Sequence, residues 1–285
     1  MNPILVLTKL TFREAIRRRI MLAGLILGLC FLVIFTIGFH FIVTQVRGAV
    51  EANAPSRGIA NVIDTEGMNA FLMAGLYAVT FLSVATAALL AADTLAGEIN
   101  SGTIQTIVTK PIRRADVVLG KWLGFAGLLG LYILLMAGGV VLSVYAQSGY
   151  MPDGLPSGLA LIYLEALLIM TITLMCSAAF PALATGGIVF GLYGLSFIGG
   201  WIEQIGAVLE NQTAVQIGII TSLIIPSESL WRRAAFEMQT PLGGILGPTP
   251  FGAASVPSVL MIVYAVLYLA VALISSIRIF QRRDL

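Results

Sequence analysis

Long, unbroken apolar runs constrain this chain more than any other feature. The first extends from Ile20 to Val43, and only His40 and a few small or hydroxyl residues interrupt it. Hydrophobic residues make up 58% of the chain and charged residues 11%. Soluble domains carry roughly 25% charged residues, so this chain has too much apolar surface to fold in water. Because the runs lack two-residue alternation, a β-barrel is excluded. The sequence predicts an all-α polytopic membrane protein.

Six of these runs are long enough to cross a membrane as helices, which takes about 20 residues. The first run is too long for the apolar region of a signal peptide, so we expect it to remain as a span. The spans form one transmembrane domain, residues 20–285. Their expected positions are about 20–44, 68–92, 117–145, 159–180, 185–205 and 254–277.

Residues 1–20 are expected to form an amphipathic helix that lies along the membrane surface. Apolar and basic residues fall on opposite sides at helical spacing. Pro3 suits the start of a helix. The apolar side has Leu5, Leu10, Phe12 and Ile16, and the basic side has Lys9, Arg13 and Arg17.

The placement of lysine and arginine predicts the orientation. Twelve of the 16 basic residues fall in segments 1–20, 93–121 and 278–285. Basic residues gather on the cytoplasmic side of membrane proteins. We therefore expect an inner-membrane protein with an even number of spans and both termini in the cytoplasm.

The loop 206–253, expected on the outer side, contains a second pair of helical segments. Its first half is too polar to face lipid, and Pro226 then breaks the chain. Ser227 is expected to cap a short amphipathic helix. The pair is predicted to be re-entrant or surface-lying. The alternative is a seventh span, which would place Arg232 and Arg233 inside but the arginines of the C-terminal tail outside.

The sequence excludes several catalytic functions. The phosphate-binding pattern Gly-x-x-x-x-Gly-Lys-Ser/Thr is absent, because Gly120 and Lys121 are followed by Trp122. No Gly-x-Ser-x-Gly elbow occurs. His40 is the only histidine, which excludes a histidine-based metal cluster. We expect no catalytic residue, metal or cofactor in this chain, and no nucleic-acid partner.

A polar, basic segment, residues 93–121, separates the second and third runs. Helix-breaking and capping residues surround a short semi-apolar stretch, and Pro111 ends it. This pattern predicts a short helix parallel to the membrane, suited to docking in a groove of another protein. The alternative is a solvated loop with positive-inside charges. The breaking and capping residues are Gly97, Glu98, Ser101, Gly102 and Thr103.

This segment resembles the signature of type-2 ABC transporter permeases. The resemblance rests on Glu98-x-x-Ser101-Gly102-Thr103, on Lys110-Pro111-Ile112-Arg113-Arg114, and on Leu119-Gly120-Lys121. The opening 10–19 is similar to the branch linked to multi-copper enzyme (nitrous-oxide reductase) maturation.

The resemblance implies a six-span half-transporter of the exporter kind, driven by ATP and Mg on a separate ATPase subunit. It also implies a second permease copy or paralogue, with membrane lipid around both. The loop 93–116 would be the coupling helix that meets the ATPase, and the N-terminal helix would touch the same subunit. The coupling residues would be Glu98, Ser101, Gly102, Thr103, Lys110, Pro111, Arg113 and Arg114, with Arg13, Glu14 and Arg17 from the N-terminal helix.

Glu165 is the one clearly intramembrane acid, about two turns into the fourth span. Such residues are functional candidates, so Glu165 is a possible pathway residue. If the span begins later, Glu165 is merely interfacial. Glycine pairs at i, i+4 predict close helix crossings rather than sites. They are Gly24/Gly28, Gly120/Gly124 and Gly187/Gly191.

Two other functions remain open. One is a secondary transporter or channel without an ATPase, which would show repeats and broken helices at mid-membrane. The other is a membrane anchor for the assembly of another enzyme.

Overall fold

The fold is that of a computed structural model, which describes residues 3–53, 57–100, 113–240, 251 and 255–282. Within these ranges the regular structure is entirely helical. The helices are α1 (Pro3–Arg17), α2 (Arg19–Asn53), α3 (Arg57–Ala92), α4 (Thr94–Asn100), α6 (Arg114–Ser148), α7 (Leu155–Ala179), α8 (Ala182–Val208), α9 (Gln212–Ile224), α10 (Ser227–Glu237) and α11 (Val259–Arg282).

Six segments of the described chain are long and apolar enough to cross a membrane, which confirms the predicted all-α polytopic class. A seventh would exist only if α9 and α10 were one span, but they are bent by 109° relative to each other. The six are Arg19–Gln45, Asp64–Gly97, Arg114–Ser148, Leu155–Ala179, Ala182–Val208 and Val259–Arg282.

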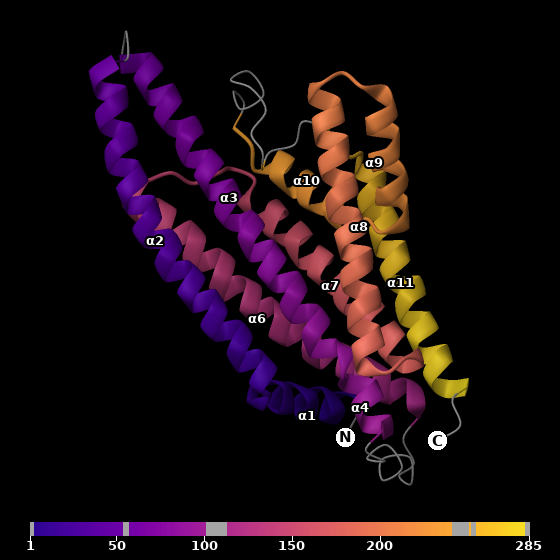
Figure 1. The fold of residues 1–285 in the computed structure, drawn as a ribbon. Coiled ribbons are helices and arrows are strands. Elements are labelled where there is room, and N and C mark those ends of the chain that lie inside the picture. Colours follow the sequence, from indigo (N-terminus) through magenta and orange to yellow (C-terminus); the bar gives the residue numbers. More distant parts are fainter. Residues whose placement is uncertain (1–2, 54–56, 101–112, 241–250, 252–254, 283–285) are drawn as a thin grey trace.

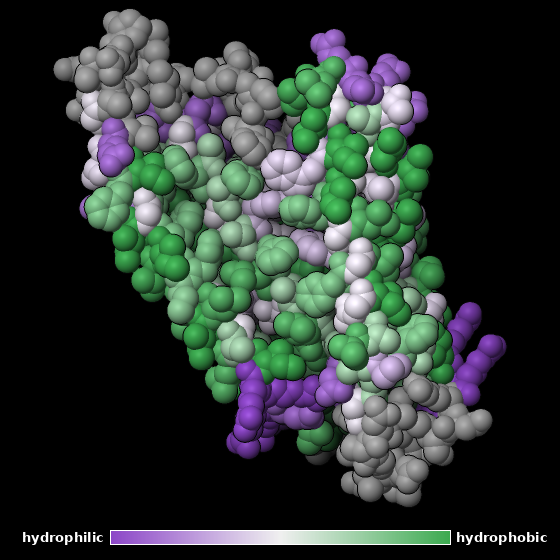
Figure 2. Space-filling model, in the orientation of Figure 1, coloured by the Kyte–Doolittle hydropathy of each residue, from purple (hydrophilic) through white to green (hydrophobic). Residues whose placement is uncertain are grey.

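The spans form a bundle with α6 and α7 at its centre (Figure 1). The α2–α3 pair lies on one side, and α8, α9 and α11 lie on the other. Helix α1 crosses one end of the bundle, where both chain termini are also found. We call this the terminal end and the opposite one the far end. Hydrophilic residues gather at the two ends of the face shown in Figure 2, and a broad apolar surface separates them. This is the surface that a membrane protein presents to lipid.

Helix α7 is the most enclosed of the spans. In its most apolar stretch 67% of the residues are buried inside the protein, whereas the figure for α2 is 11%. Leu76 of α3, Met136 of α6 and Ile162 of α7 are among the fully buried side chains of the main core. Helix α2 therefore faces lipid or a partner over most of its length.

Residues 45–67, which separate the first two expected spans, are largely helical. Helix α2 continues to Asn53, and α3 begins already at Arg57. The expected spans were read from hydropathy, and polarity marks where a helix leaves the hydrocarbon core. It does not mark where the helix ends, because polar residues continue a helix readily in water.

Helices α8 and α9 pack closely because glycines face the neighbouring helix. A Cβ atom placed on Gly199 would lie 1.8 Å from Oγ1 of Thr221, and one on Gly218 would lie 2.2 Å from Cβ of Glu203. Neither position has room for a larger side chain. Helix α9 thus runs back from the far end along α8, and α10 turns away at Pro226. A pair bent in this way is either a re-entrant loop, as predicted, or a broken seventh span.

Ser227 does not cap α10, contrary to the expectation. The N-cap position is Pro226, which forms no side-chain cap. Ser227 Oγ donates instead to Oγ of Ser196 on α8 (3.0 Å), and the Glu228 N–H donates to the same oxygen (3.2 Å). Because the start of α10 is buried against α8, a neighbouring helix supplies the acceptor that a local cap would supply in water.

Replacing Asn211 with alanine should weaken the α8–α9 turn. The Asn211 side chain caps α9 by accepting from the N–H groups of Thr213 (3.1 Å) and Ala214 (3.2 Å). We expect Asn211→Ala to lower the free energy of unfolding by about 1 kcal/mol, the usual loss for an N-cap. The apparent melting temperature in detergent measures this. Gln212→Ala, an exposed neighbour, should leave it unchanged, and equal melting of both variants would contradict the capping role.

Candidate functional site

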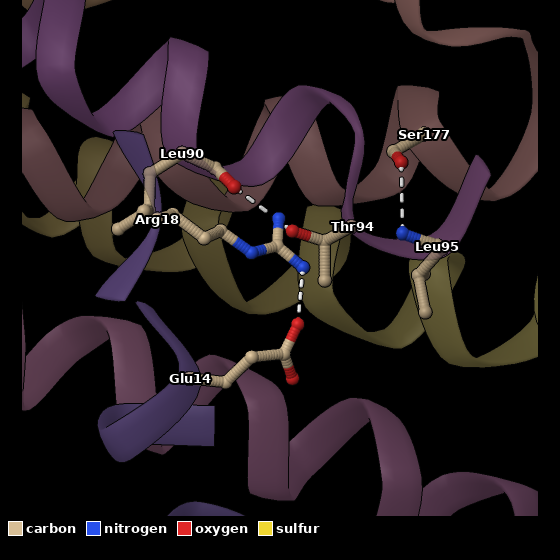
Figure 3. Close-up of polar contacts among 6 residues, drawn as sticks. All are labelled: Glu14, Arg18, Leu90, Thr94, Leu95 and Ser177. Carbon is tan, nitrogen blue, oxygen red and sulfur yellow. Dashed lines mark hydrogen bonds and ion pairs between the residues drawn. The ribbon is translucent and has the colours of Figure 1, made fainter. Parts of the chain in front are cut away.

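A short elbow joins the second and third spans at the terminal end. Helix α3 ends at Ala92, and α4 begins at Thr94, whose hydroxyl donates to the Leu90 carbonyl (2.9 Å). The Leu95 N–H donates to Oγ of Ser177 on α7 at 3.2 Å (Figure 3), and the Ala96 N–H donates to the same oxygen at 3.1 Å. The first amides of a helix have no partner within it. Here α7 supplies the acceptor, which ties α4 to the central span.

An apolar cluster also packs against the elbow at the terminal end. We call it the base cluster, and its residues come from four helices that meet at the terminal end. Each is at most 4% exposed. A displacement of α4 would therefore be transmitted to three spans at once. The base cluster comprises Leu95 of α4, Val117 and Val118 of α6, Leu174 and Ala178 of α7, and Phe280 of α11.

Ser177→Ala should loosen α4 from α7. The change leaves two buried amides, those of Leu95 and Ala96, without their acceptor, and each unpaired buried group costs about 1–3 kcal/mol. We expect a lower melting temperature and faster proteolysis of the elbow. Ser276→Ala is the matched control, because Ser276 is also fully buried but its hydroxyl has no hydrogen-bond partner. Equal effects of the two changes would contradict the role of Ser177.

Helix α1 lies in a shallow groove on α6 that glycine makes possible. A Cβ on Gly120 would approach Cβ of Leu7 to 2.5 Å, and one on Gly124 would approach the Thr8 carbonyl oxygen to 3.0 Å. Thr11 and Ala15 of α1 are buried. Leu5 is 66% exposed, as expected for a side chain that faces lipid. Residues 3–17 thus form a helix, and its buried side packs on α6.

The candidate residues of α1 lie at its exposed side and its C-terminal end. Arg13 and Arg17 are exposed. Glu14 pairs with Arg18, which lies at the bend between α1 and α2 (2.7 Å, Figure 3). Exposed ion pairs of this kind contribute little to stability. Arg13 and Arg17 remain exposed at the terminal end of the bundle.

The structure places some of the predicted coupling residues. Gly97 and Glu98 both lie within α4. The pair was expected to break the helix, but the helix continues through it. Arg113 is exposed just before α6, and Arg114 donates from Nη1 to the Gln281 carbonyl at the end of α11 (3.0 Å). Ser101, Gly102, Thr103, Lys110 and Pro111 lie outside the described residues.

A second polar site lies inside the bundle. Glu165 of α7 is fully buried, and α7 begins at Leu155, earlier than the expected span rather than later. Glu165 interacts electrostatically with Glu228 of α10, which is also buried and accepts a hydrogen bond from the Tyr77 hydroxyl of α3 (3.2 Å). The Trp201 indole N–H of α8 donates to the same Tyr77 oxygen (3.2 Å). Four helices therefore meet at this site.

An ion pair adjoins this polar site. Nη1 of Arg232 on α10 lies 2.5 Å from Oε1 of Glu203 on α8, and both side chains are at least 96% buried. Ser222 accepts from Arg232 (3.2 Å), and Ser255 donates to Glu203 (2.7 Å). Arg232 was expected in an outer loop. Charge counting cannot reveal that a loop folds back into the bundle and carries its arginine with it.

An apolar groove reaches the same region from the side. It has a volume of about 610 Å³ and is lined by α2, α3, Phe197 and Phe251. Tyr77 belongs both to this groove and to the polar site. Among the described residues no group of three or more His, Cys, Asp or Glu side chains could hold a metal ion.

Two comparisons with known proteins agree with this architecture. The sequence model of the family described as "ABC-2 family transporter protein" matches residues 5–285. The probable ABC transporter permease protein NosY of Pseudomonas aeruginosa is 39% identical over 67 residues, which is 24% of this chain and 24% of that protein. The family match covers almost the whole length, including the elbow, the polar site and all six spans. The chain belongs to the ABC-2 family of transporter proteins.

Proposed function

We propose that this chain is the permease subunit of an ATP-driven exporter and that a separate ATPase subunit docks on its terminal end. The observation that carries the proposal is the elbow. Helix α4 is joined to α7 through Ser177 and to α6 and α11 through the base cluster. A push on α4 would therefore move several spans together, which is what conversion of ATP binding into transport requires.

The charge at the terminal end supports the same docking surface. Arg13 and Arg17 on α1 and Arg113 before α6 are exposed there. Basic residues gather on the cytoplasmic side of membrane proteins, so we place both termini and the elbow in the cytoplasm. The similarity to a probable ABC transporter permease points to the same class of partner.

A second copy of the chain, or a paralogue, would complete the transporter. Helix α2 has the least buried apolar stretch of the six spans, and a Cβ on Gly187 or Gly191 of α8 would meet nothing within 4 Å. Glycine faces of this spacing allow close approach of a helix from another subunit. We propose that α2 and α8 contribute to that contact, with lipid covering the rest.

Co-purification with the ATPase tests the proposal. A soluble ATPase should stay bound to the wild type in mild detergent and be lost from Glu98→Lys and from Arg113→Glu. Glu210→Lys is the control, because Glu210 is exposed at the α8–α9 turn, at the far end. Unchanged transport after residues 97–113 are replaced by a Gly/Ser linker would refute the proposal. It would favour a secondary transporter or channel without an ATPase.

A further inference from the structure

Two buried carboxyl groups, on the packed helices α7 and α10, interact electrostatically inside the bundle. Glu165 lies about 15 Å along α7 from Leu155 and about 21 Å from Ala179, at about 1.5 Å per residue. Glu228 lies in the first turn of α10, just after the break at Pro226. The membrane core is about 30 Å thick, so the pair lies deep within it.

The two carboxyl groups have unequal surroundings. Glu228 accepts a hydrogen bond from Tyr77, lies at the N-terminal end of α10 and is attracted by Arg232. Burial disfavours ionisation of both carboxyl groups, and at Glu228 these three features offset part of that cost. Glu165 is fully buried, and in the part of the chain that the structure describes neither of its oxygens has a hydrogen-bond partner. No described residue is found to stabilise a negative charge on it.

An ionised Glu165 would therefore be very unfavourable. A carboxylate without partners in a low-dielectric interior costs many kcal/mol, and the charge of Glu228 would repel it further. Of two carboxyl groups with such different surroundings, Glu165 is the one that is harder to ionise and so keeps the proton. We propose that Glu165 and Glu228 form a proton-binding site, in which Glu165 holds a proton while α10 is packed against α7.

The neighbouring groups favour a proton over a metal ion. Within the described part of the chain, the other titratable or charged groups that interact with the pair are Tyr77, Tyr193 and Arg232. The first two are phenols and the third is a cation, so none is a good additional ligand for a metal. Glu203, the remaining nearby acid, is occupied by Arg232.

The site responds to the position of α10. If α10 moves away from α7, water reaches Glu165 and the proton leaves, and both carboxylates are then hydrated. Conversely, loss of the proton while α10 is packed in place creates repulsion that drives the helix away. Proton occupancy and α10 closure are therefore linked. This inference goes beyond the proposed function, and its test needs no ATPase.

Infrared spectroscopy of the purified full chain in lipid nanodiscs tests the site directly. At about pH 7.5 ordinary carboxyl groups are ionised, since their pKa is about 4. The wild type should nevertheless show the C=O stretch of one protonated carboxyl group. Glu165→Gln should remove it, and Glu237→Gln should retain it, because Glu237 forms a partly exposed pair with Arg233. Absence of the band in the wild type, or its survival in Glu165→Gln, would overturn the proposal. So would a band that disappears on addition of a metal salt.

Cysteine labelling tests the link to α10. Ser229 is buried on α10, so a thiol in Ser229→Cys, with Cys30 and Cys176 replaced by alanine, should be protected from a maleimide. Raising the pH should increase labelling by about tenfold per unit beyond the effect of thiol ionisation. The same cysteine combined with Glu165→Gln gives the baseline, because glutamine cannot ionise. Identical pH profiles in the two backgrounds would overturn the linkage.

Discussion

Arg232→Met should destabilise the protein severely. It leaves Glu203 as an uncompensated charge between α8 and α10, where both members of the pair are at least 96% buried. Removing one partner of a buried ion pair costs about 3–5 kcal/mol. We expect a correspondingly large fall in the free energy of unfolding, measured by denaturation in mixed micelles.

A double variant distinguishes the effect of the two charges from the effect of the volume that the two side chains fill. Glu203→Met with Arg232→Met removes both charges and should recover most of the lost stability, because apolar replacements of buried pairs are often neutral or favourable. Arg233→Met is the matched control. Arg233 pairs with Glu237 one turn away in a partly exposed site, so the loss should stay below about 1 kcal/mol. A double variant no more stable than Arg232→Met alone would contradict the ion-pair explanation.

The sequence predicted the spans well because hydropathy reports the thickness of the membrane directly. The predicted first span, 20–44, corresponds to Arg19–Gln45, and the break at Pro181 separates α7 from α8. Between the first two spans, at 45–67, the helices continue beyond the ends of the predicted spans. Membrane insertion and helix formation have different causes, and the apolar pattern reports only the first.

The buried polar site could be predicted only in part. Glu165 stands out because it interrupts an apolar run. Glu228 and Arg232 lie in a polar stretch, where charged residues are ordinary, and nothing in the local pattern indicates burial. Their burial depends on α9 folding back along α8 through Gly199 and Gly218, which is a tertiary property. The available signal in the sequence was a glycine in each of two consecutive apolar segments, Gly199 and Gly218, which allows the two helices to pack closely.

Replacing Gly124 with alanine should displace α1 from α6. A Cβ there would lie 2.9 Å from Cβ of Thr11 and 3.0 Å from the Thr8 carbonyl oxygen, and a backbone atom cannot move aside as a side-chain tip can. Overpacking of this kind costs about 1–3 kcal/mol. Because α1 carries Arg13 and Arg17 at the proposed docking surface, the ATPase should also be retained less well. Melting temperature and co-purification measure the two effects.

Gly127→Ala is the matched control on the same helix. A Cβ at Gly127 would meet only Cε2 of Phe12, at 4.0 Å, which is ordinary van der Waals contact. Alanine is favoured over glycine within a helix by about 1 kcal/mol, so this variant should be as stable as the wild type or slightly more so. The two glycine substitutions should thus change stability in opposite directions, although they lie one turn apart. The contrary result is that the two variants have the same melting temperature and retain the same amount of ATPase. That result would show that α1 is not held in the groove of α6 and does not position a docking surface.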